Sequence, residues 1–212
     1  LAWNALAFNR DLSLPVEELN RREQETGFAD SPARGGATLT LPELRRARVP
    51  VCVATVLVRS GPDVPRRNGV KRVDLDFATQ EIAYSLGQGQ LAYYRLLEKQ
   101  GVLRVIATRA ELTAHWQAWL RAPDAEPLGV IFSMEGADPI VSPAQAADWF
   151  AQGLRAVGPA HYGRSHYAFG TAVDGPLTDA GVQLLKEFAR LGMILDVTHL
   201  SDRSFWHAMD VY

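Results

Sequence analysis

The sequence contains a single cysteine, Cys52, among 212 residues. One cysteine cannot form a disulfide within the chain. Cys52 lies inside the apolar run at residues 49–58, where we expect it to pack as a small core side chain. A lone thiol of this kind suits a reducing compartment without proving one.

Long apolar stretches are also missing. No run of about 18 or more apolar residues occurs, so we expect no membrane span in this chain. The first residues have neither the basic segment nor the long apolar segment of a signal peptide, and the sequence does not begin with methionine. We therefore expect the natural N-terminus to lie outside this sequence.

The chain has little excess charge. A net charge of −2 gives no general attraction to nucleic acid or to anionic lipid. Arginine clusters occur, but they lack the interleaved aromatic residues that stack on the bases of single strands, so we expect no nucleic-acid partner. With 47% hydrophobic and 22% charged residues, the composition is that of an ordinary globular protein.

Short apolar runs alternate with amphipathic stretches, regularly from residue 101 onward and less regularly before it. The apolar runs predict strands at residues 51–58, 128–133, 154–157 and 193–197. The amphipathic stretches predict helices at residues 77–100, 144–152, 179–191 and 201–211. Ser142 and Thr178 are expected as helix N-caps, and the first of these helices could be a pair broken near Gly87 and Gly89. Residues 26–42 and 59–72 are expected to form long loops.

This alternation of continuous apolar strands with helices indicates an α/β protein with a parallel sheet. Two architectures fit, an open doubly wound sheet and an eight-stranded β/α barrel. Neither of the common glycine-rich phosphate-binding motifs follows a strand, which weakens the case for a nucleotide-binding fold. In a barrel, the chemistry is expected just past the C-terminal ends of the strands.

Three chemically suitable residues follow three of the predicted strands. Glu135, His161 and His199 come just after the strands at 128–133, 154–157 and 193–197. Carboxylate and imidazole are ligands for Zn²⁺ and related ions, and metal-bound water can act as a nucleophile. Each residue alone is more often a solvated glutamate or a structural histidine, and the metal prediction depends on their coincidence at equivalent positions.

The remaining histidines are less informative. His115 and His207 lie in stretches predicted to be helical and are expected to be surface or packing residues. His166 lies in a loop and could be structural or functional.

Several segments resemble, in order, the membrane (renal) dipeptidase family of zinc metallopeptidases. These segments are residues 133–138, 153–162, 177–181 and 191–201, and residues 1–4 resemble the segment just after that family's first metal motif. The resemblance implies a (β/α)8 TIM-like barrel with two zinc ions. It also implies that residues 1–212 form a single, incomplete barrel domain covering roughly strands two to five.

The resemblance also assigns roles to individual residues. Glu135 would bridge the two zinc ions, His199 would bind the second, and His161 would contact the substrate and the developing oxyanion. Trp3 would lie near the substrate. The implied activity is that of a hydrolase that cleaves dipeptides through a zinc-bridged hydroxide. The family is often dimeric, which makes a homodimer a candidate assembly, and bacterial members suggest a cytoplasmic location.

The sequence departs from the family pattern at its ends. The first metal motif would precede Leu1 and further ligands would follow Tyr212, so two of five expected metal ligands are present. We therefore expect these 212 residues alone to be inactive and poorly soluble. Asp196 could orient the ligands or be merely structural.

Two rival functions remain open. The first is another amidohydrolase-type metal hydrolase, such as a deaminase or lactonase. Many of these bridge their metals with a modified lysine after the fourth strand, where this sequence has none. The second is a catalytically dead barrel that acts as a binding module.

Overall fold

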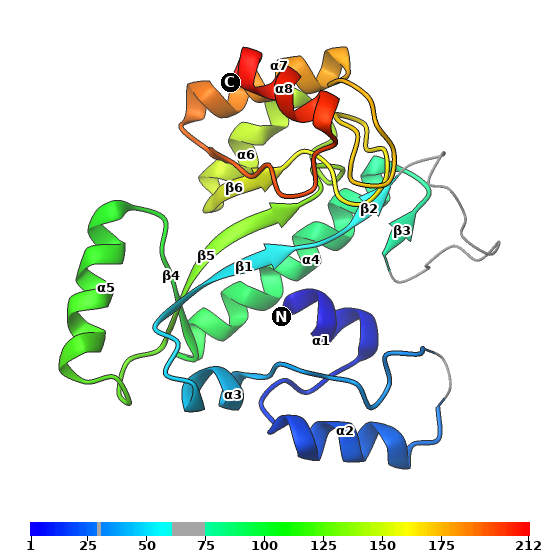
Figure 1. Ribbon diagram of the computed structural model, residues 1–212. Helices are drawn as coiled ribbons and strands as arrows, with labels where there is room; N and C mark the ends of the chain where they lie inside the picture. Colours follow the sequence, from blue (N-terminus) through cyan, green and yellow to red (C-terminus); the bar gives the residue numbers. More distant parts are fainter. Residues whose placement is uncertain (29–30, 61–74) are drawn as a thin grey trace. The chain divides into compact units, whose positions relative to one another are not determined.

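A computed structural model describes residues 1–28, 31–60 and 75–212. Most of the expected loop at 59–72, and residues 29–30 of the loop at 26–42, lie outside the described residues. Figure 1 labels the helices and strands along the chain. By its internal contacts the chain divides into two compact units. The first unit comprises Leu1–Ala54 and Tyr93–Ile131, and the second comprises Thr55–Ala92 and Phe132–Tyr212.

Parallel strands form the main sheet. The strands are β1 (Val51–Val56), β4 (Leu103–Val105), β5 (Leu128–Glu135), β6 (Leu154–Gly158) and β7 (Ile194–Leu195). Strand β5 pairs in parallel with β4 and with β6, and β6 pairs in parallel with β7. Most residues of β5 are buried, as expected for a strand covered on both faces.

The order of these strands bears on the choice between the two architectures. The described strands are arranged β1-β5-β6-β7, which follows their order in the chain, with the short β4 also pairing with β5. A doubly wound sheet reverses its strand order at a switch point, whereas a barrel adds strands in succession. The α/β class with a parallel sheet is confirmed, and closure into eight strands stays a prediction.

The first unit contains helices that the sequence patterns did not predict. They are α1 (Ala2–Phe8), α2 (Val16–Glu25) and α3 (Leu41–Arg46). The unit also contains α5 (Arg109–Arg121), which includes His115 and lies in a stretch that was expected to be helical. A small core forms around Ala5, Leu12 and Leu19. A buried ion pair joins Arg10 to Glu23 at 2.6 Å.

The second unit contains the helices that support the candidate site. They are α6 (Ala146–Ala151), α7 (Asp179–Leu191), α8 (Asp202–Val211) and the first part of α4 (Gln80–Lys99). Helix α7 begins as predicted, because the Thr178 hydroxyl accepts a hydrogen bond from the amide of Gly181, and it ends at Gly192 with a φ of 70°. A short parallel pair, β2 (Arg59–Ser60) and β3 (Asp76–Phe77), completes this unit.

Of the two alternatives for residues 77–100, the single helix is observed, because α4 is continuous through Gly87 and Gly89. Other details of the sequence prediction are wrong, since residues 59–60 form a strand instead of a loop. Ser142 precedes a short 3₁₀ turn but makes no side-chain cap. The last predicted strand is shorter than expected, because only Ile194–Leu195 pair. No described helix is long and apolar enough to cross a membrane.

Candidate metal centre

The ends of three parallel strands bring Glu135, His161 and His199 together within the second unit. Glu135 is the last residue of β5, and the two histidines follow β6 and β7. The Oε1 atom of Glu135 lies 3.2 Å from Nε2 of His161 and 3.1 Å from Nε2 of His199. The two imidazole rings pack edge to face with their centroids 4.4 Å apart. The predicted convergence of Glu135 and His199 is therefore observed.

Tight turns place these side chains. Gly136 follows Glu135 with a φ of 93°, and its amide donates to the carbonyl of Gly158 at 3.1 Å. This positive φ is readily adopted only by glycine, so the chain can turn away directly after the carboxylate. The His199 turn is held by Asp196, whose Oδ1 accepts from the amide and the hydroxyl of Thr198 at 3.0 and 2.6 Å. Asp196 thus supports His199 through the backbone.

A close backbone contact supports His161. A Cβ atom added to Gly170 would lie 1.7 Å from the carbonyl oxygen of His161. The Gly170 amide also donates to the carbonyl of Gly163 at 3.0 Å. Only glycine fits at this position, and the loop after β6 folds back on the segment that carries the imidazole.

The hydrogen bonds within the cluster favour the ionised form of its carboxylate. The hydrogen bond from His161 holds the pKa of Glu135 below its ordinary value, although partial burial opposes this effect, and His199 adds a smaller contribution in the same direction. The side chains are 33%, 11% and 19% exposed for Glu135, His161 and His199, so the site is open at the carboxylate. An ionised carboxylate beside imidazoles is a suitable donor set for a divalent cation.

The geometry is also suitable for a metal ion. One donor atom from each of the three residues lies within 4.8 Å of the others. A tetrahedral Zn²⁺ site takes nitrogen and oxygen donors of these kinds, and a catalytic site leaves one position open for water or substrate. Glu135 and His199 fit the predicted roles as ligands, and by distance alone His161 could be a third.

The residues that support the two site histidines were not predicted from the sequence. Nη1 of Arg59 lies 3.3 Å from Nδ1 of His161, and Nη2 forms an ion pair with Asp76 at 2.6 Å. The hydroxyl of Thr171 lies 3.4 Å from Nδ1 of His199. A usable signal existed for Arg59, because it directly follows the predicted strand at 51–58, as the three site residues follow theirs.

The other candidate residues are not members of this three-residue cluster. Trp3 belongs to the first unit, on α1, where its ring packs edge to face against Phe8. His115 is buried and its Nε2 lies 2.8 Å from the carbonyl of Pro50, which confirms its packing role. His166 is exposed and His207 is half-buried.

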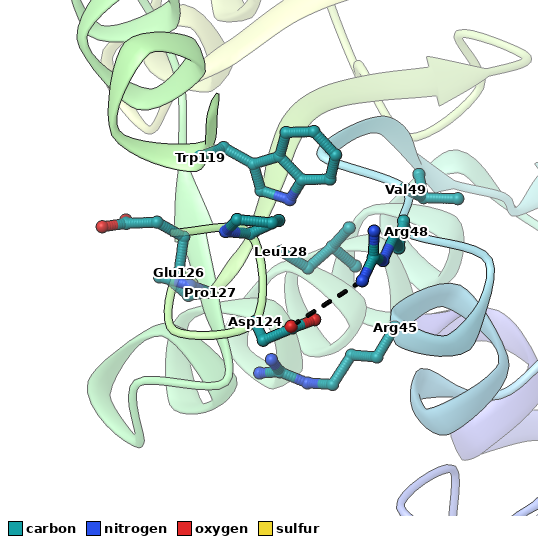
Figure 2. Close-up of a pocket in the computed structure, with 9 residues that line it drawn as sticks. Arg45, Arg48, Val49, Trp119, Asp124, Glu126, Pro127 and Leu128 are labelled. Carbon is teal, nitrogen blue, oxygen red and sulfur yellow. Dashed lines mark ion pairs between the residues drawn. The ribbon is translucent and has the colours of Figure 1, made fainter. Parts of the chain in front are cut away.

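The first unit contains a separate small pocket of about 210 Å³ (Figure 2). Figure 2 shows Arg48 directed toward Asp124, with which it forms an ion pair at 3.9 Å. Glu126, also in the lining, pairs with Arg104 at 3.0 Å. The pocket is smaller than typical ligand sites of about 300–1,000 Å³, and its acidic groups already have basic partners. The metal cluster is therefore the better candidate site.

The chain matches one protein family and is similar to a curated protein. A family model described as membrane dipeptidase (peptidase family M19) matches residues 22–212. Among curated proteins, an uncharacterised protein in the PQQ-III 3′ region of Acinetobacter calcoaceticus is 28% identical over 93 residues, which cover 40% of this chain and 30% of that protein.

Two solved structures share the fold. A metallo peptidase from Rhodobacter sphaeroides, liganded with a phosphinate mimic of the dipeptide L-Ala-D-Ala, is 20% identical with a TM-score of 0.65; the match covers 92% of this chain and 59% of that one. The dipeptidase AC is 23% identical with a TM-score of 0.64, covering 92% of this chain and 57% of that one. The chain thus spans less than two thirds of each of these relatives.

Proposed function

The chain belongs to the membrane dipeptidase family, and from this premise we propose that it forms part of a zinc-dependent dipeptidase. One observation carries the proposal: Oε1 of Glu135 lies close to the Nε2 atoms of both His161 and His199. These residues come from the ends of three adjacent parallel strands, where a β/α barrel places its chemistry.

Glu135 and His199 would hold the metal. We infer a zinc centre of two ions in the intact enzyme, for which Glu135 and His199 would be ligands. When bound, the metal supplies an activated water and polarises the carbonyl under attack. Glu135 is suited to this role because its carboxylate is ionised and only partly buried.

His161 would act on the substrate. Its Nε2 faces the centre of the cluster, where it can donate a hydrogen bond to the oxygen that becomes negative as the peptide carbonyl is attacked. Removing one such donor costs on the order of 10²–10³-fold in turnover. Trp3 remains a candidate for a contact with the substrate.

The substrate class follows from family membership and from the Rhodobacter neighbour, which was solved with a dipeptide mimic. We propose dipeptides as substrates and no nucleic-acid partner. A homodimer remains a proposal based on the family. The rival amidohydrolase function would use the same ligands on a different substrate.

The test uses the full-length protein. Purified protein should contain zinc and hydrolyse a panel of dipeptides, lose turnover on chelation and regain it when Zn²⁺ is restored. Glu135→Gln keeps the side-chain size but removes the negative charge, so zinc content and turnover should both fall sharply. Glu17→Gln, at an exposed position on α2, is the matched control and should change neither.

Two results would overturn the proposal. Unchanged zinc content and dipeptide turnover in Glu135→Gln would remove this carboxylate from the site. A protein that leaves dipeptides intact but hydrolyses lactones or deaminates amines would belong to the rival class of metal hydrolases.

A further inference from the structure

Arg59 contacts the imidazole of His161 in the second unit, on the side of the ring that carries Nδ1. Its Nη1 atom is 3.3 Å from the Nδ1 atom of the imidazole. Its Nη2 atom is 2.6 Å from Oδ1 of Asp76, the residue opposite it in the parallel pair of β2 and β3. The side chains of Arg59 and Asp76 are only 13% and 7% exposed, so the guanidinium is held by a buried carboxylate.

This contact restricts the protonation of His161. A guanidinium has hydrogen-bond donors and no acceptor, and it remains protonated in proteins. The Nδ1 atom facing it must therefore accept, which requires a neutral imidazole with its proton on Nε2. The other side of the ring agrees, because Nε2 lies 3.2 Å from Oε1 of Glu135, which can only accept when ionised.

We propose that Arg59 is a positioning residue that fixes His161 as a neutral Nε2–H donor and keeps it from serving as a metal ligand. An imidazole that binds a metal through Nε2 must present a lone pair there, and it usually donates its Nδ1–H to a carboxylate or carbonyl. His161 has a donor at that position instead. The inference deepens the proposed function and rests on it.

His199 has a different environment, although it lies equally close to Glu135. Its Nδ1 is 3.4 Å from the hydroxyl of Thr171, which can accept a hydrogen bond as well as donate one. Without a metal, Nε2 of His199 donates to Oε1 of Glu135 at 3.1 Å. Because Thr171 can accept from Nδ1, the proton can move there and leave the lone pair of Nε2 for a metal. The three-residue cluster thus divides into two metal ligands, Glu135 and His199, and one hydrogen-bond donor, His161.

His115 provides an internal reference for this tautomer. Its Nδ1 lies 3.3 Å from Nη1 of Arg104, and its Nε2 lies 2.8 Å from the carbonyl of Pro50. A carbonyl can only accept, so His115 must also carry its proton on Nε2. The same arginine–imidazole arrangement therefore occurs in the first unit, where no catalytic role is proposed.

The test reads the tautomer directly. ¹⁵N NMR of histidine-labelled protein distinguishes protonated from unprotonated ring nitrogens, and the His161 signals are assigned by their loss in His161→Ala. In the wild type, His161 and His115 should both show a protonated Nε2 and an unprotonated Nδ1. In Arg59→Met, His161 should become a mixture of tautomers while His115 stays unchanged.

Kinetics provide the second measurement. Arg59→Met should lower kcat for dipeptide hydrolysis by up to about 100-fold, because the oxyanion donor is lost in part of the molecules, with zinc content unchanged. Arg59→Lys, which keeps a donor, should recover part of the turnover. Arg109→Met, at an exposed position on α5, should behave as wild type. If Arg59→Met does not fold because Asp76 is left buried and unpaired, the double variant with Asp76→Asn removes that charge.

Other outcomes would overturn the inference. A wild-type His161 with its proton on Nδ1 would contradict it, as would an Arg59→Met variant with unchanged tautomer and kcat. Loss of bound zinc in His161→Ala would make His161 a ligand. If the full-length protein shows the expected His161 tautomer but hydrolyses no dipeptide, the proposed function is rejected and the role of Arg59 in fixing the tautomer is retained.

Discussion

Asp138 is a buried acidic residue of the second unit, and the pKa of its carboxyl group is strongly raised. The residue is 2% exposed, and its two oxygens accept from the amides of Ser60 and His166 at 2.9 and 3.1 Å. Burial raises the pKa of Asp138 to about 7, and the two backbone hydrogen bonds and the nearby Arg59 only partly oppose this effect. Asp138 thereby ties β2 to the loop that follows His161.

This pKa shift predicts a pH-dependent stability. An unfolded aspartate has a pKa of about 3.9, so between that pH and about 7 the folded state binds more protons at Asp138 than the unfolded state. The stability gained is fully present below about pH 4 and is lost as the pH rises through 7. The free energy of unfolding, measured with denaturant across this pH range, should decrease as the pH rises. This decrease should be smaller in Asp138→Asn, whereas Asp148→Asn, at an exposed position, should retain it. An equal decrease in all three proteins would contradict the shift.

The site residues differ in how far the sequence could identify them. Glu135, His161 and His199 were found because each follows a strand made recognisable by its continuous apolar residues. Arg59 was missed because its own short strand was taken as part of a loop. Asp76 could not have been found by pattern, because its role depends on pairing with Arg59 in a strand pair of two residues each.

At the scale of elements, the second half of the chain was predicted better than the first. Buried parallel strands and capped amphipathic helices leave strong periodic signals, and β5, β6 and α7 appear close to where they were predicted. The short helices α1, α2 and α3 gave no such signal, because they bury only two or three residues each. In α6 the buried aromatic residue is Trp149, whereas Phe150 is only partly buried.

The two glycines of α4 explain why a helix break was one of the two alternatives and why none occurs. Gly89 is exposed, and a Cβ atom added there would meet nothing within 4 Å. A Cβ atom at Gly87 would lie 3.1 Å from the Trp149 ring and 3.2 Å from Pro139. Gly87 therefore permits close packing against the helix, whereas Gly89 only costs helix stability.

The two positions should respond oppositely to alanine. Gly89→Ala should raise the free energy of unfolding by about 0.5–1 kcal/mol, because alanine is the better helix former. Gly87→Ala gains the same helix propensity but must displace Trp149 or Pro139, and overpacking of this kind costs about 1–3 kcal/mol. Urea unfolding of the two variants provides a matched comparison within one helix. A gain in stability for both would show that the contact at Gly87 is not tight.

At the scale of the whole molecule, the number of metal ligands limits what this chain can do by itself. The matched solved structures are longer, and the chain covers 59% and 57% of the two described above. Among the described residues, the candidate ligand cluster comprises Glu135, His161 and His199. If Arg59 makes His161 a donor, two ligands remain, whereas a zinc ion needs three or four protein ligands.

The 212-residue chain, purified alone, should therefore bind zinc weakly and fail to turn over dipeptides. Calorimetric titration should detect at most one Zn²⁺ site. Free zinc at a concentration near or below the weak Kd should raise the melting temperature of the chain only slightly, since ligand stabilisation grows with the ratio of free ligand to Kd. His199→Ala should abolish this binding, and His161→Ala should leave it in place. Tight binding of two zinc ions with dipeptide turnover by this chain would show that residues outside the cluster complete the centre.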